Sequence, residues 1–208
     1  MRDAQNIEQI ASLSPDFIGF IFYPRSKRYV RQSDLDVEYL DKLLPKNLPT
    51  SIKRVGVFVE STDVEVERIA RQWKLDFVQL HSKESPTFCK KLKGKGFKII
   101  KVFSVGKEGI STPIMREYED VVDYFLFDTQ TSDYGGSGHK FDWEILRTYD
   151  LKIPFMLSGG ISLEDIEKLK GHIHHHCIGF DINSKFETAP AQKNAILIEQ
   201  FITSLRKT

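Results

Sequence analysis

The strongest constraint on the fold is a regular alternation of short apolar runs with windows of helical spacing. The apolar runs lie at residues 17–23, 52–59, 77–80, 97–103, 124–127, 153–157 and 178–182. Between them, apolar side chains recur at helical spacing, for example at Val64, Val66, Ile69 and Trp73. A second window, which Gly171 can end, contains Leu163, Ile166 and Leu169. Because strands that alternate with helices form parallel sheets, the sequence predicts an α/β fold.

The number of units indicates which α/β architecture to expect. Seven strand–helix units in about 200 residues suit a compact (β/α)8 TIM barrel better than a doubly wound sheet, which usually has five or six strands. One strand is then missing, and we place the gap at the start, since Asp3 can cap a helix through Ile7, Ile10 and Leu13 with no strand before it. No linker divides the chain, so we expect one TIM-barrel domain over residues 1–208, N-terminally truncated and without its first β-strand.

Composition and charge exclude several classes of protein. Of the 208 residues, 40% are apolar, and 30 basic residues nearly balance 29 acidic ones, which gives no electrostatic basis for binding nucleic acid or an anionic membrane. Cys89 and Cys177 lack the spacing of a disulfide scaffold or a zinc site. The N-terminus lacks the apolar run of a signal peptide, and no stretch approaches the roughly 18 apolar residues of a membrane span. We therefore expect a soluble cytoplasmic protein.

Two neighbouring loops are candidates for phosphate binding, because active sites of such barrels lie on loops after the carboxyl ends of strands. Gly159 and Gly160 follow the sixth run, and two adjacent glycines let backbone N–H groups approach an anion. Asn183 and Ser184 follow the last run. Neither glycine motif of nucleotide-binding proteins is present, so we expect a sugar phosphate. The alternative for each loop is an ordinary tight turn.

Asp128 ends an apolar run at the carboxyl end of a predicted strand. Partial desolvation there would raise the pKa of its carboxyl group, which suits a general acid. The alternative is an aspartate that only caps or turns the chain. Residues 130–140, with Gly135, Gly136 and Gly138, form a loop that is long and glycine-rich enough to act as a mobile cover.

Basic residues and one histidine also follow predicted strands. Arg25, Lys27 and Arg28 come after the first run, where a guanidinium can hold a substrate carboxylate through two hydrogen bonds. Solvated surface charge is the alternative. His81 ends the third run, and the sequence is compatible with either a packing or a catalytic histidine.

A histidine cluster invites comparison with metal sites. It consists of His172, His174, His175 and His176 and is followed by Cys177. These residues precede the last strand and therefore face the end of the barrel opposite to the active site, and their spacing matches no ligand set. We expect no physiological metal site there, and adventitious nickel binding instead.

Several of these segments, in the same order and over nearly the whole chain, resemble the phosphoribosylanthranilate isomerase family of tryptophan biosynthesis. With x for a position that need not match, the matching segments are GFIFYPxSxRY at residues 19–29, RVGVFV at 54–59, VQLH at 78–81, FDT at 127–129, YGGSGxxFDW at 134–143, LSGG at 157–160 and DINS at 181–184. Collinear motifs are far more specific than any single one.

The resemblance implies an enzyme that needs no cofactor or metal and carries out an Amadori rearrangement. Its phosphorylated small-molecule substrate would be N-(5-phosphoribosyl)anthranilate, and its product 1-(2-carboxyphenylamino)-1-deoxyribulose 5-phosphate. Asp128 would be the general acid, and Arg28 would anchor the anthranilate carboxylate. His81 and Asp181 would also contact the substrate, Asp181 near the ribose hydroxyls. The phosphate would be bound by Gly159, Gly160, Asn183 and Ser184. We expect a monomer or a homodimer.

The chain also departs from the family pattern. The family's general base is a cysteine in a Lys-x-Cys-Gly motif, which aligns two positions before Met1 and is not in this sequence. We do not expect Cys89 or Cys177 to reach the site, so impaired turnover is predicted. Lys185 stands where the family often has a glycine. Two alternatives stay open: a catalytically inactive sugar-phosphate-binding barrel, and another sugar-phosphate isomerase or epimerase. An epimerase would lack its expected metal-ligand histidines and would leave Arg28 unexplained.

Overall fold

A single parallel sheet organises the molecule. The computed structural model describes residues 1–30, 42–44, 48–106, 109–129, 142–171 and 174–206. Its seven strands follow one another in chain order, and each pairs in parallel with the next. They are β1 (Phe17–Ile21), β2 (Lys53–Phe58), β3 (Phe77–Leu80), β4 (Lys98–Val105), β5 (Tyr124–Thr129), β6 (Phe155–Leu157) and β7 (Cys177–Phe180). All seven predicted apolar runs therefore contain strands, and the predicted α/β class is confirmed.

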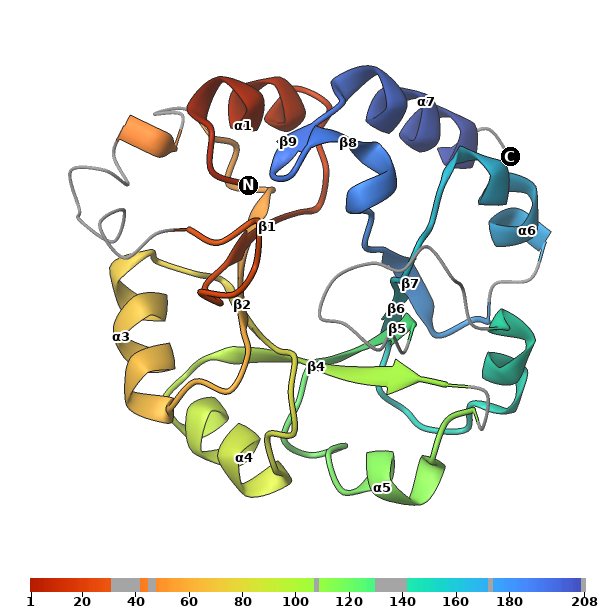
Figure 1. The fold of residues 1–208 in the computed structure, drawn as a ribbon. Helices are drawn as coiled ribbons and strands as arrows, with labels where there is room; N and C mark the ends of the chain where they lie inside the picture. Colours follow the sequence, from red (N-terminus) through yellow and green to blue (C-terminus); the bar gives the residue numbers. More distant parts are fainter. Residues whose placement is uncertain (31–41, 45–47, 107–108, 130–141, 172–173, 207–208) are drawn as a thin grey trace.

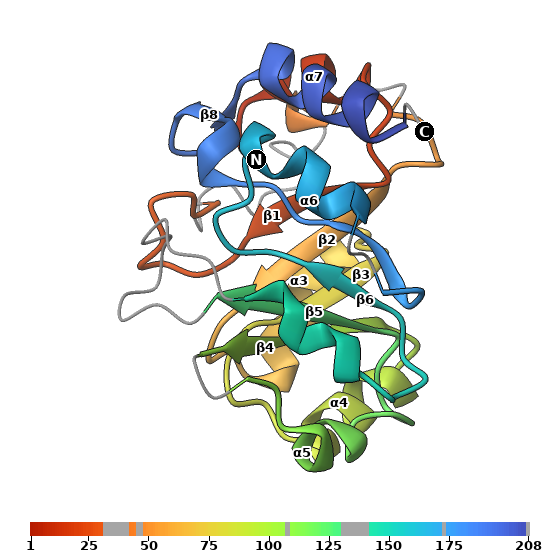
Figure 2. The ribbon, with the colours of Figure 1, turned by 90° about the vertical axis from the view of Figure 1, so that its right-hand side faces the viewer.

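Helices surround the sheet (Figure 1). The α-helices are α1 (Ala4–Ala11), α3 (Asp63–Gln72), α4 (Pro86–Gly94), α5 (Thr112–Arg116), α6 (Ile166–Gly171) and α7 (Ala195–Arg206). Shorter 3-10 helices are η2 (Trp143–Thr148), η3 (Leu163–Asp165) and η4 (Ser184–Phe186), and an antiparallel hairpin joins β8 (Glu187–Ala189) to β9 (Gln192–Lys193). Figure 2 shows α1 and α7 on one side of the strands and α4 and α5 on the other. None of the described helices is long and apolar enough to cross a membrane.

Local signals explain where the helices begin and end. Asp3 caps α1 by accepting a hydrogen bond from the N–H of Asn6 at 2.8 Å, as predicted. α6 reaches Gly171, and residues 172–173 lie outside the described residues, so the helix stop at Gly171 stays a prediction. The predicted helical window at 64–73 is confirmed by α3, although Val64 is 68% exposed, whereas Val66 and Ile69 face the core. Val64 lies in the first turn of α3, on the face that solvent covers.

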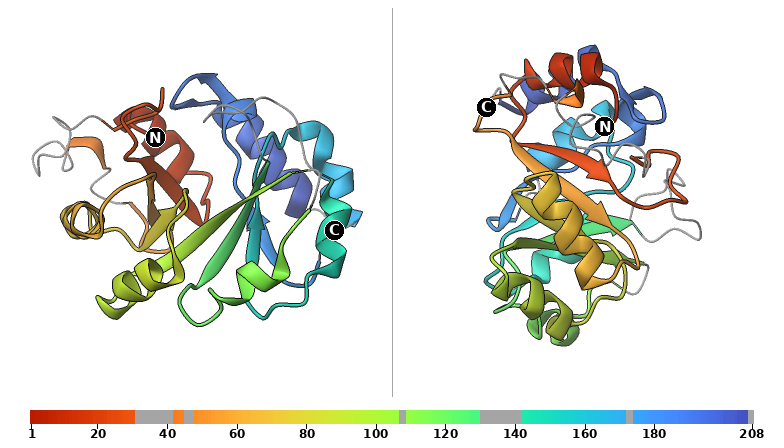
Figure 3. Two further views of the ribbon diagram at one scale, coloured as in Figure 1. Left: turned by 60° about the horizontal axis from the view of Figure 1, so that its bottom comes forward. Right: turned by 90° about the vertical axis from the view of Figure 1, so that its left-hand side faces the viewer.

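The sheet curls and therefore has an inner and an outer face. Because successive side chains of a strand point to opposite faces, they form an inner and an outer apolar layer. The inner cluster consists of Val55, Phe77, Ile100, Val102, Leu126 and Met156. Phe17 on β1 and Tyr124 on β5 contact each other with ring centroids 6.5 Å apart, although three strands separate them in the sheet order. Figure 3 shows the strands crossing the middle of the molecule, with α3 and α4 on one side and α6 on the other. The larger outer cluster joins the sheet to the helices.

The two ends of the sheet are not joined to each other within the described residues. The strand order begins with β1 and ends with β7, and each of these strands pairs with one neighbour there. Ile178 on β7 is 49% exposed. On the outer side of β1, the carbonyl oxygen of Gly19 accepts from the Met1 amino group and that of Ile21 accepts the N–H of Val30 at 2.9 Å. The described fold is therefore an all-parallel, curled seven-stranded sheet of the TIM-barrel type, with β1 and β7 as its end strands.

Candidate active site

Asp128 and His81 meet at the carboxyl end of the sheet. Asp128 lies near the end of β5, and His81 directly follows β3. The Nε2 atom of His81 is 3.4 Å from Oδ2 of Asp128, and their side chains are 30% and 25% exposed. Oδ1 of Asp128 accepts a hydrogen bond from the N–H of Thr129 at 2.9 Å. The structure thus brings two predicted site residues together, and the imidazole of His81 faces the half-buried carboxyl group of Asp128.

A buried ion pair fixes the loop that carries His81. Lys101 on β4 donates through Nζ to Oε2 of Glu84 at 2.8 Å and to the carbonyl oxygen of Ser82. The side chains of Lys101 and Glu84 are 3% and 6% exposed, and Tyr118 donates its hydroxyl to the carbonyl oxygen of Glu84 at 2.9 Å. Because every partner is enclosed, the backbone after β3 is held in place, and with it the position of His81.

Asp181 follows β7 and lies among the same charged groups. Its N–H donates to the carbonyl oxygen of Leu157 at 2.7 Å, which holds it beside the end of β6. Burial raises the pKa of Asp181, and the negative charge of Asp128 raises it further, whereas Lys193, His81 and a hydrogen bond with Ser158 act in the opposite direction. The charges of Asp128 and His81 therefore act on Asp181, and its contact with the substrate stays a prediction.

The turn at Gly159 and Gly160 needs glycine for geometric reasons. Their φ angles are +91° and +69°, in the left-handed region that other residues rarely adopt. A Cβ atom on Gly159 would lie 2.3 Å from Oγ1 and 2.6 Å from the backbone nitrogen of Thr129. The turn therefore packs directly against the end of β5, next to Asp128.

The loop after β7 carries Asn183 and Ser184. Asn183 precedes η4, and its carbonyl oxygen accepts the N–H of Phe186 at 2.9 Å. Ser184 and Lys185 are exposed. Since β6 and β7 are adjacent and parallel, this loop and the Gly159–Gly160 turn both lie at the carboxyl end of the sheet. The structure thus places the four predicted phosphate ligands on neighbouring loops.

Arg28 is held by Glu187, which Lys193 also binds; the sequence reasoning missed both Glu187 and Lys193. Nε of Arg28 lies 3.0 and 2.9 Å from the two carboxylate oxygens of Glu187, and Nη2 binds Oε2 as well. Nζ of Lys193 donates to Oε1 of Glu187 at 3.1 Å and to Oδ1 of Asn183 at 2.6 Å. Arg25 and Lys27, in contrast, are exposed, which agrees with solvated surface charge. Only Arg28 of the three predicted cations joins this cluster.

Burial and charge act against each other in this cluster. Burial alone would raise the pKa of Glu187, but the hydrogen bonds from Arg28 and Lys193 and the charge of Lys193 outweigh it and hold the pKa below its ordinary value. Burial lowers the pKa of Lys193, and the carboxylates of Glu187 and Asp181 oppose that shift. No sequence motif marked Glu187, which lies 159 residues from Arg28; only the fold brings the two together.

The remaining candidate residues lie elsewhere. Cys89 is buried in α4, and Cys177 is the first residue of β7, at the opposite end of that strand from Asp181. Burial raises the pKa of each thiol to about 11. Residues 130–140, the predicted mobile cover, and His172 lie outside the described residues.

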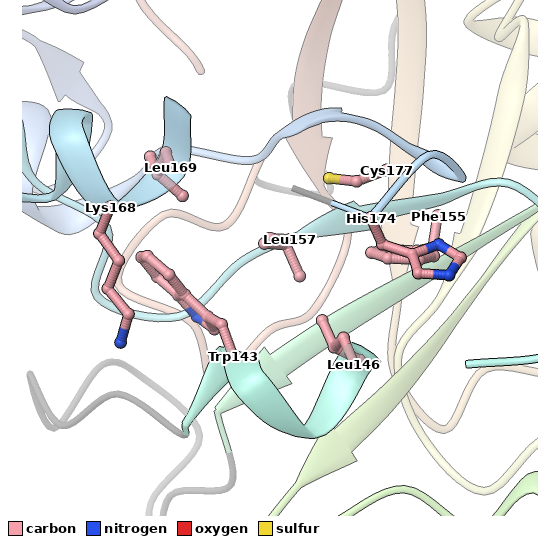
Figure 4. Close-up of a pocket in the computed structure, with 8 residues that line it drawn as sticks. All are labelled: Trp143, Leu146, Phe155, Leu157, Lys168, Leu169, His174 and Cys177. Atoms are coloured by element: carbon pink, nitrogen blue, oxygen red, sulfur yellow. The ribbon is translucent and has the colours of Figure 1, made fainter. Parts of the chain in front are cut away.

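A histidine cluster and a small apolar pocket lie apart from these loops. The ligand atoms of His174, His175 and His176 lie within 4.8 Å of one another, so the prediction that no physiological metal binds there stays a prediction. His174 and Cys177 also line the pocket shown in Figure 4, together with Trp143, Leu146, Phe155, Leu157, Lys168 and Leu169. The pocket lies between β6, η2 and α6, away from Asp128.

Comparison with known proteins gives one consistent result. A family model described as N-(5'phosphoribosyl)anthranilate (PRA) isomerase matches residues 1–204. The chain is 43% identical over 206 residues to the N-(5'-phosphoribosyl)anthranilate isomerase of Parabacteroides distasonis, which covers 99% of this chain and 90% of that protein.

Solved structures agree with this result. A phosphoribosyl anthranilate isomerase in complex with reduced 1-(o-carboxyphenylamino)-1-deoxyribulose 5-phosphate has a TM-score of 0.78 and 26% identity, covering 100% of this chain and 96% of that one. Monomers generated from the dimeric enzyme of Thermotoga maritima have a TM-score of 0.77 and 25% identity, with the same coverage.

Proposed function

Because the chain belongs to the N-(5'-phosphoribosyl)anthranilate isomerase family, we propose that it converts N-(5-phosphoribosyl)anthranilate to 1-(2-carboxyphenylamino)-1-deoxyribulose 5-phosphate in tryptophan biosynthesis. The observation that carries the proposal is the arrangement of functional groups at the carboxyl end of the sheet. Asp128, an acid, lies at the carboxyl end of β5, and Arg28, a guanidinium, and two loops with backbone N–H donors follow the carboxyl ends of other strands. An acid, a carboxylate anchor and a phosphate cradle are what this substrate requires.

Asp128 acts as the general acid in the proposed mechanism. Its proton goes to the ribose ring oxygen, the bond between that oxygen and C1 breaks, and a Schiff base with the anthranilate nitrogen forms. A proton then leaves C2, which yields an enolamine; protonation of C1 and loss of the proton of the C2 hydroxyl give the ketose product, and no external oxidant or reductant enters. His81, 3.4 Å from Asp128, lies beside the reacting end of the substrate.

The two charged ends of the substrate bind at separate places. Gly159, Gly160, Asn183 and Ser184 hold the phosphate through backbone N–H groups and short side chains. Arg28 binds the anthranilate carboxylate through the part of its guanidinium that faces away from Glu187. Asp181 lies near the ribose hydroxyls, between the phosphate loops and Asp128.

The base that removes the C2 proton is not assigned to a described residue. Cys89 and Cys177 lie away from Asp128 and are protonated near neutral pH, so neither serves this role. The expected impairment of turnover stays a prediction. We further propose that an eighth strand fits between β1 and β7, replacing the contact of the Met1 amino group with Gly19 on the outer side of β1. It would complete a single (β/α)8 domain and bring its own carboxyl end beside those of β1 and β7.

The other expectations also stay predictions. They are a cytoplasmic location, the absence of a cofactor, and a monomeric or homodimeric state, of which the homodimer is supported by the dimeric relative.

Turnover and binding, measured together, test the proposal. We expect the chain to bind reduced 1-(o-carboxyphenylamino)-1-deoxyribulose 5-phosphate and to convert the substrate, and Asp128→Asn to lower the rate by about 10² to 10⁴-fold with binding retained. Asp63→Asn is the matched control, because Asp63 pairs with Lys91 and Lys95 on the outer helices. Equal rates in the wild type and Asp128→Asn would contradict the role of Asp128. Binding without turnover would favour an inactive sugar-phosphate-binding barrel.

A further inference from the structure

Glu187 is the most enclosed member of the cluster that contains Arg28. Its side chain is 4% exposed, compared with 19% for Arg28 and 12% for Lys193. Besides its bonds with those two cations, Oε1 accepts the N–H of Ala191 at 3.2 Å. The carboxylate therefore meets donors from three residues inside the protein, and its place is fixed from three directions.

Glu187 engages only one side of the Arg28 guanidinium. The bonds run through Nε and Nη2, while Nη1 has no hydrogen-bond partner among the described residues. A free arginine side chain has several rotatable bonds, and ordering them on binding a ligand lowers affinity. A guanidinium already clamped along one side presents its remaining N–H groups in a fixed direction.

The Glu187–Arg28 pair is connected to two other segments at the carboxyl end of the sheet. Glu187 and Lys193 both lie on the β8–β9 hairpin, which Figure 1 shows next to α1. Lys193 and Asn6 of α1 exchange two hydrogen bonds, from Lys193 N–H to Asn6 Oδ1 at 2.7 Å and from Asn6 Nδ2 to the Lys193 carbonyl oxygen at 2.8 Å. Nζ of Lys193 also reaches Oδ1 of Asn183, at the proposed phosphate loop. One hairpin therefore connects the two proposed anchors of the substrate.

We propose that Glu187, neutralised by Lys193, is a positioning residue that fixes the direction of Arg28, so that the site binds the carboxylate end of its substrate there and not the phosphate end. This inference rests on the proposed function. Two unopposed cations would attract any anion, and the phosphate, which carries more charge than the carboxylate, would compete for them. The carboxylate of Glu187 removes that excess attraction and leaves a directional fork, which selects by geometry.

The experiment compares two ligands that differ in one group. They are reduced 1-(o-carboxyphenylamino)-1-deoxyribulose 5-phosphate and the same compound without its carboxyl group, each titrated calorimetrically into the wild type and into Glu187→Gln. Glutamine keeps the shape of the side chain but removes its charge. We expect the preference for the carboxylated ligand to fall about tenfold in Glu187→Gln, the size of one charge-assisted hydrogen bond. The affinity for inorganic phosphate should stay equal or rise, because one negative charge is lost.

Two further variants keep the test decisive. Glu67→Gln is the matched control, because Glu67 is also held by one arginine and one lysine, on the outer helices, and it should leave the preference unchanged. Glu187→Asp retains the charge on a shorter side chain and should show a smaller loss, and it replaces Glu187→Gln if that variant does not fold.

The outcomes separate the inference from the proposed function. An unchanged preference in the Glu187 variants would overturn the inference, as would an equal loss of affinity for both ligands and for phosphate, since Glu187 would then have a general structural role. A wild type that binds neither ligand would overturn the proposed function and the inference together.

Discussion

Two glutamates in this chain are each held by one arginine and one lysine, in different regions of the molecule. Glu67 on α3 accepts hydrogen bonds from Arg71, one turn further along the helix, at 3.0 Å and from Lys95 beyond the end of α4. Glu187 accepts them from Arg28 and Lys193 at the mouth of the sheet. The partners are of the same types, but the Glu67 side chain is 29% exposed and that of Glu187 only 4%.

The difference shows what an ion pair can do in each place. Hydrogen bonds from Lys95 and Arg71 lower the pKa of Glu67, but solvent and salt screen such pairs and their effect on stability is small. At Glu187 the same lowering of the pKa has to overcome burial first, which requires well-aligned partners. The Glu67 ion pairs lie on a helix surface, whereas the Glu187 ion pairs fix the guanidinium of Arg28 where a ligand can bind it.

Replacing each arginine by glutamine should give the largest difference between the two regions, in the affinity for ligand. Arg28→Gln removes the proposed carboxylate anchor, so the affinity for reduced 1-(o-carboxyphenylamino)-1-deoxyribulose 5-phosphate should fall by about 10 to 100-fold, the range for hydrogen bonds to a charged group. Arg71→Gln should leave the affinity unchanged. Calorimetric titration measures both, and equal affinities for the two variants would place the carboxylate elsewhere.

Replacing each lysine by methionine should give an intermediate difference, in the free energy of unfolding. Lys193→Met leaves Oε1 of Glu187 and Oδ1 of Asn183 without their Nζ donor, so the free energy of unfolding should fall by about 1 to 3 kcal/mol. Lys95→Met should have the smaller effect, because Glu67 and Asp63 are then solvated by water. Urea unfolding gives both values, and the reverse order would mean that enclosure does not distinguish the two clusters.

The smallest effect concerns acid and salt. The pKa of Glu187 is below its ordinary value of 4.5 in the folded chain, so its ion pairs contribute stability that is present above pH 4.5 and is lost as the pH falls through the lowered pKa. The stability difference between the wild type and Glu187→Gln should shrink accordingly. Asp181, whose pKa is raised, contributes with the opposite sign but is common to both proteins.

The difference in unfolding free energy between the wild type and Glu67→Gln should have the same sign but be smaller. It should decline further in 1 M salt, since exposed ion pairs are screened. Urea unfolding between pH 3 and pH 7 at two salt concentrations measures all of this. A stability difference for Glu187→Gln that grows toward acid pH would mean that the pKa of Glu187 is raised in the folded chain and not lowered.

The sequence predicted what depends on local patterns. Apolar runs and helical spacing indicated all seven strands and their parallel order, because each strand needs only its own buried residues and a following helix. Asp128, His81, Gly159 and Asn183 became candidates because they lie at or just beyond the carboxyl ends of those strands. The exposure of Val64 could not be predicted, since spacing alone does not tell which apolar residue of a first turn faces solvent.

The contacts between distant segments could not be predicted. The pairing of His81 with Asp128 depends on the curl of the sheet, and the clamp on Arg28 depends on a hairpin 159 residues further along the chain. Glu187 and Lys193 lie in a polar segment with no motif, and their burial follows from the way the hairpin packs against α1.

The most direct test of the account is a crystal structure of the chain with reduced 1-(o-carboxyphenylamino)-1-deoxyribulose 5-phosphate bound. We predict the phosphate between the Gly159–Gly160 turn and Asn183–Ser184, the carboxylate on Nη1 and Nη2 of Arg28, and Glu187 still bonded to Nε. A phosphate bound at Arg28, or a guanidinium that has left Glu187 to reach the ligand, would contradict the account.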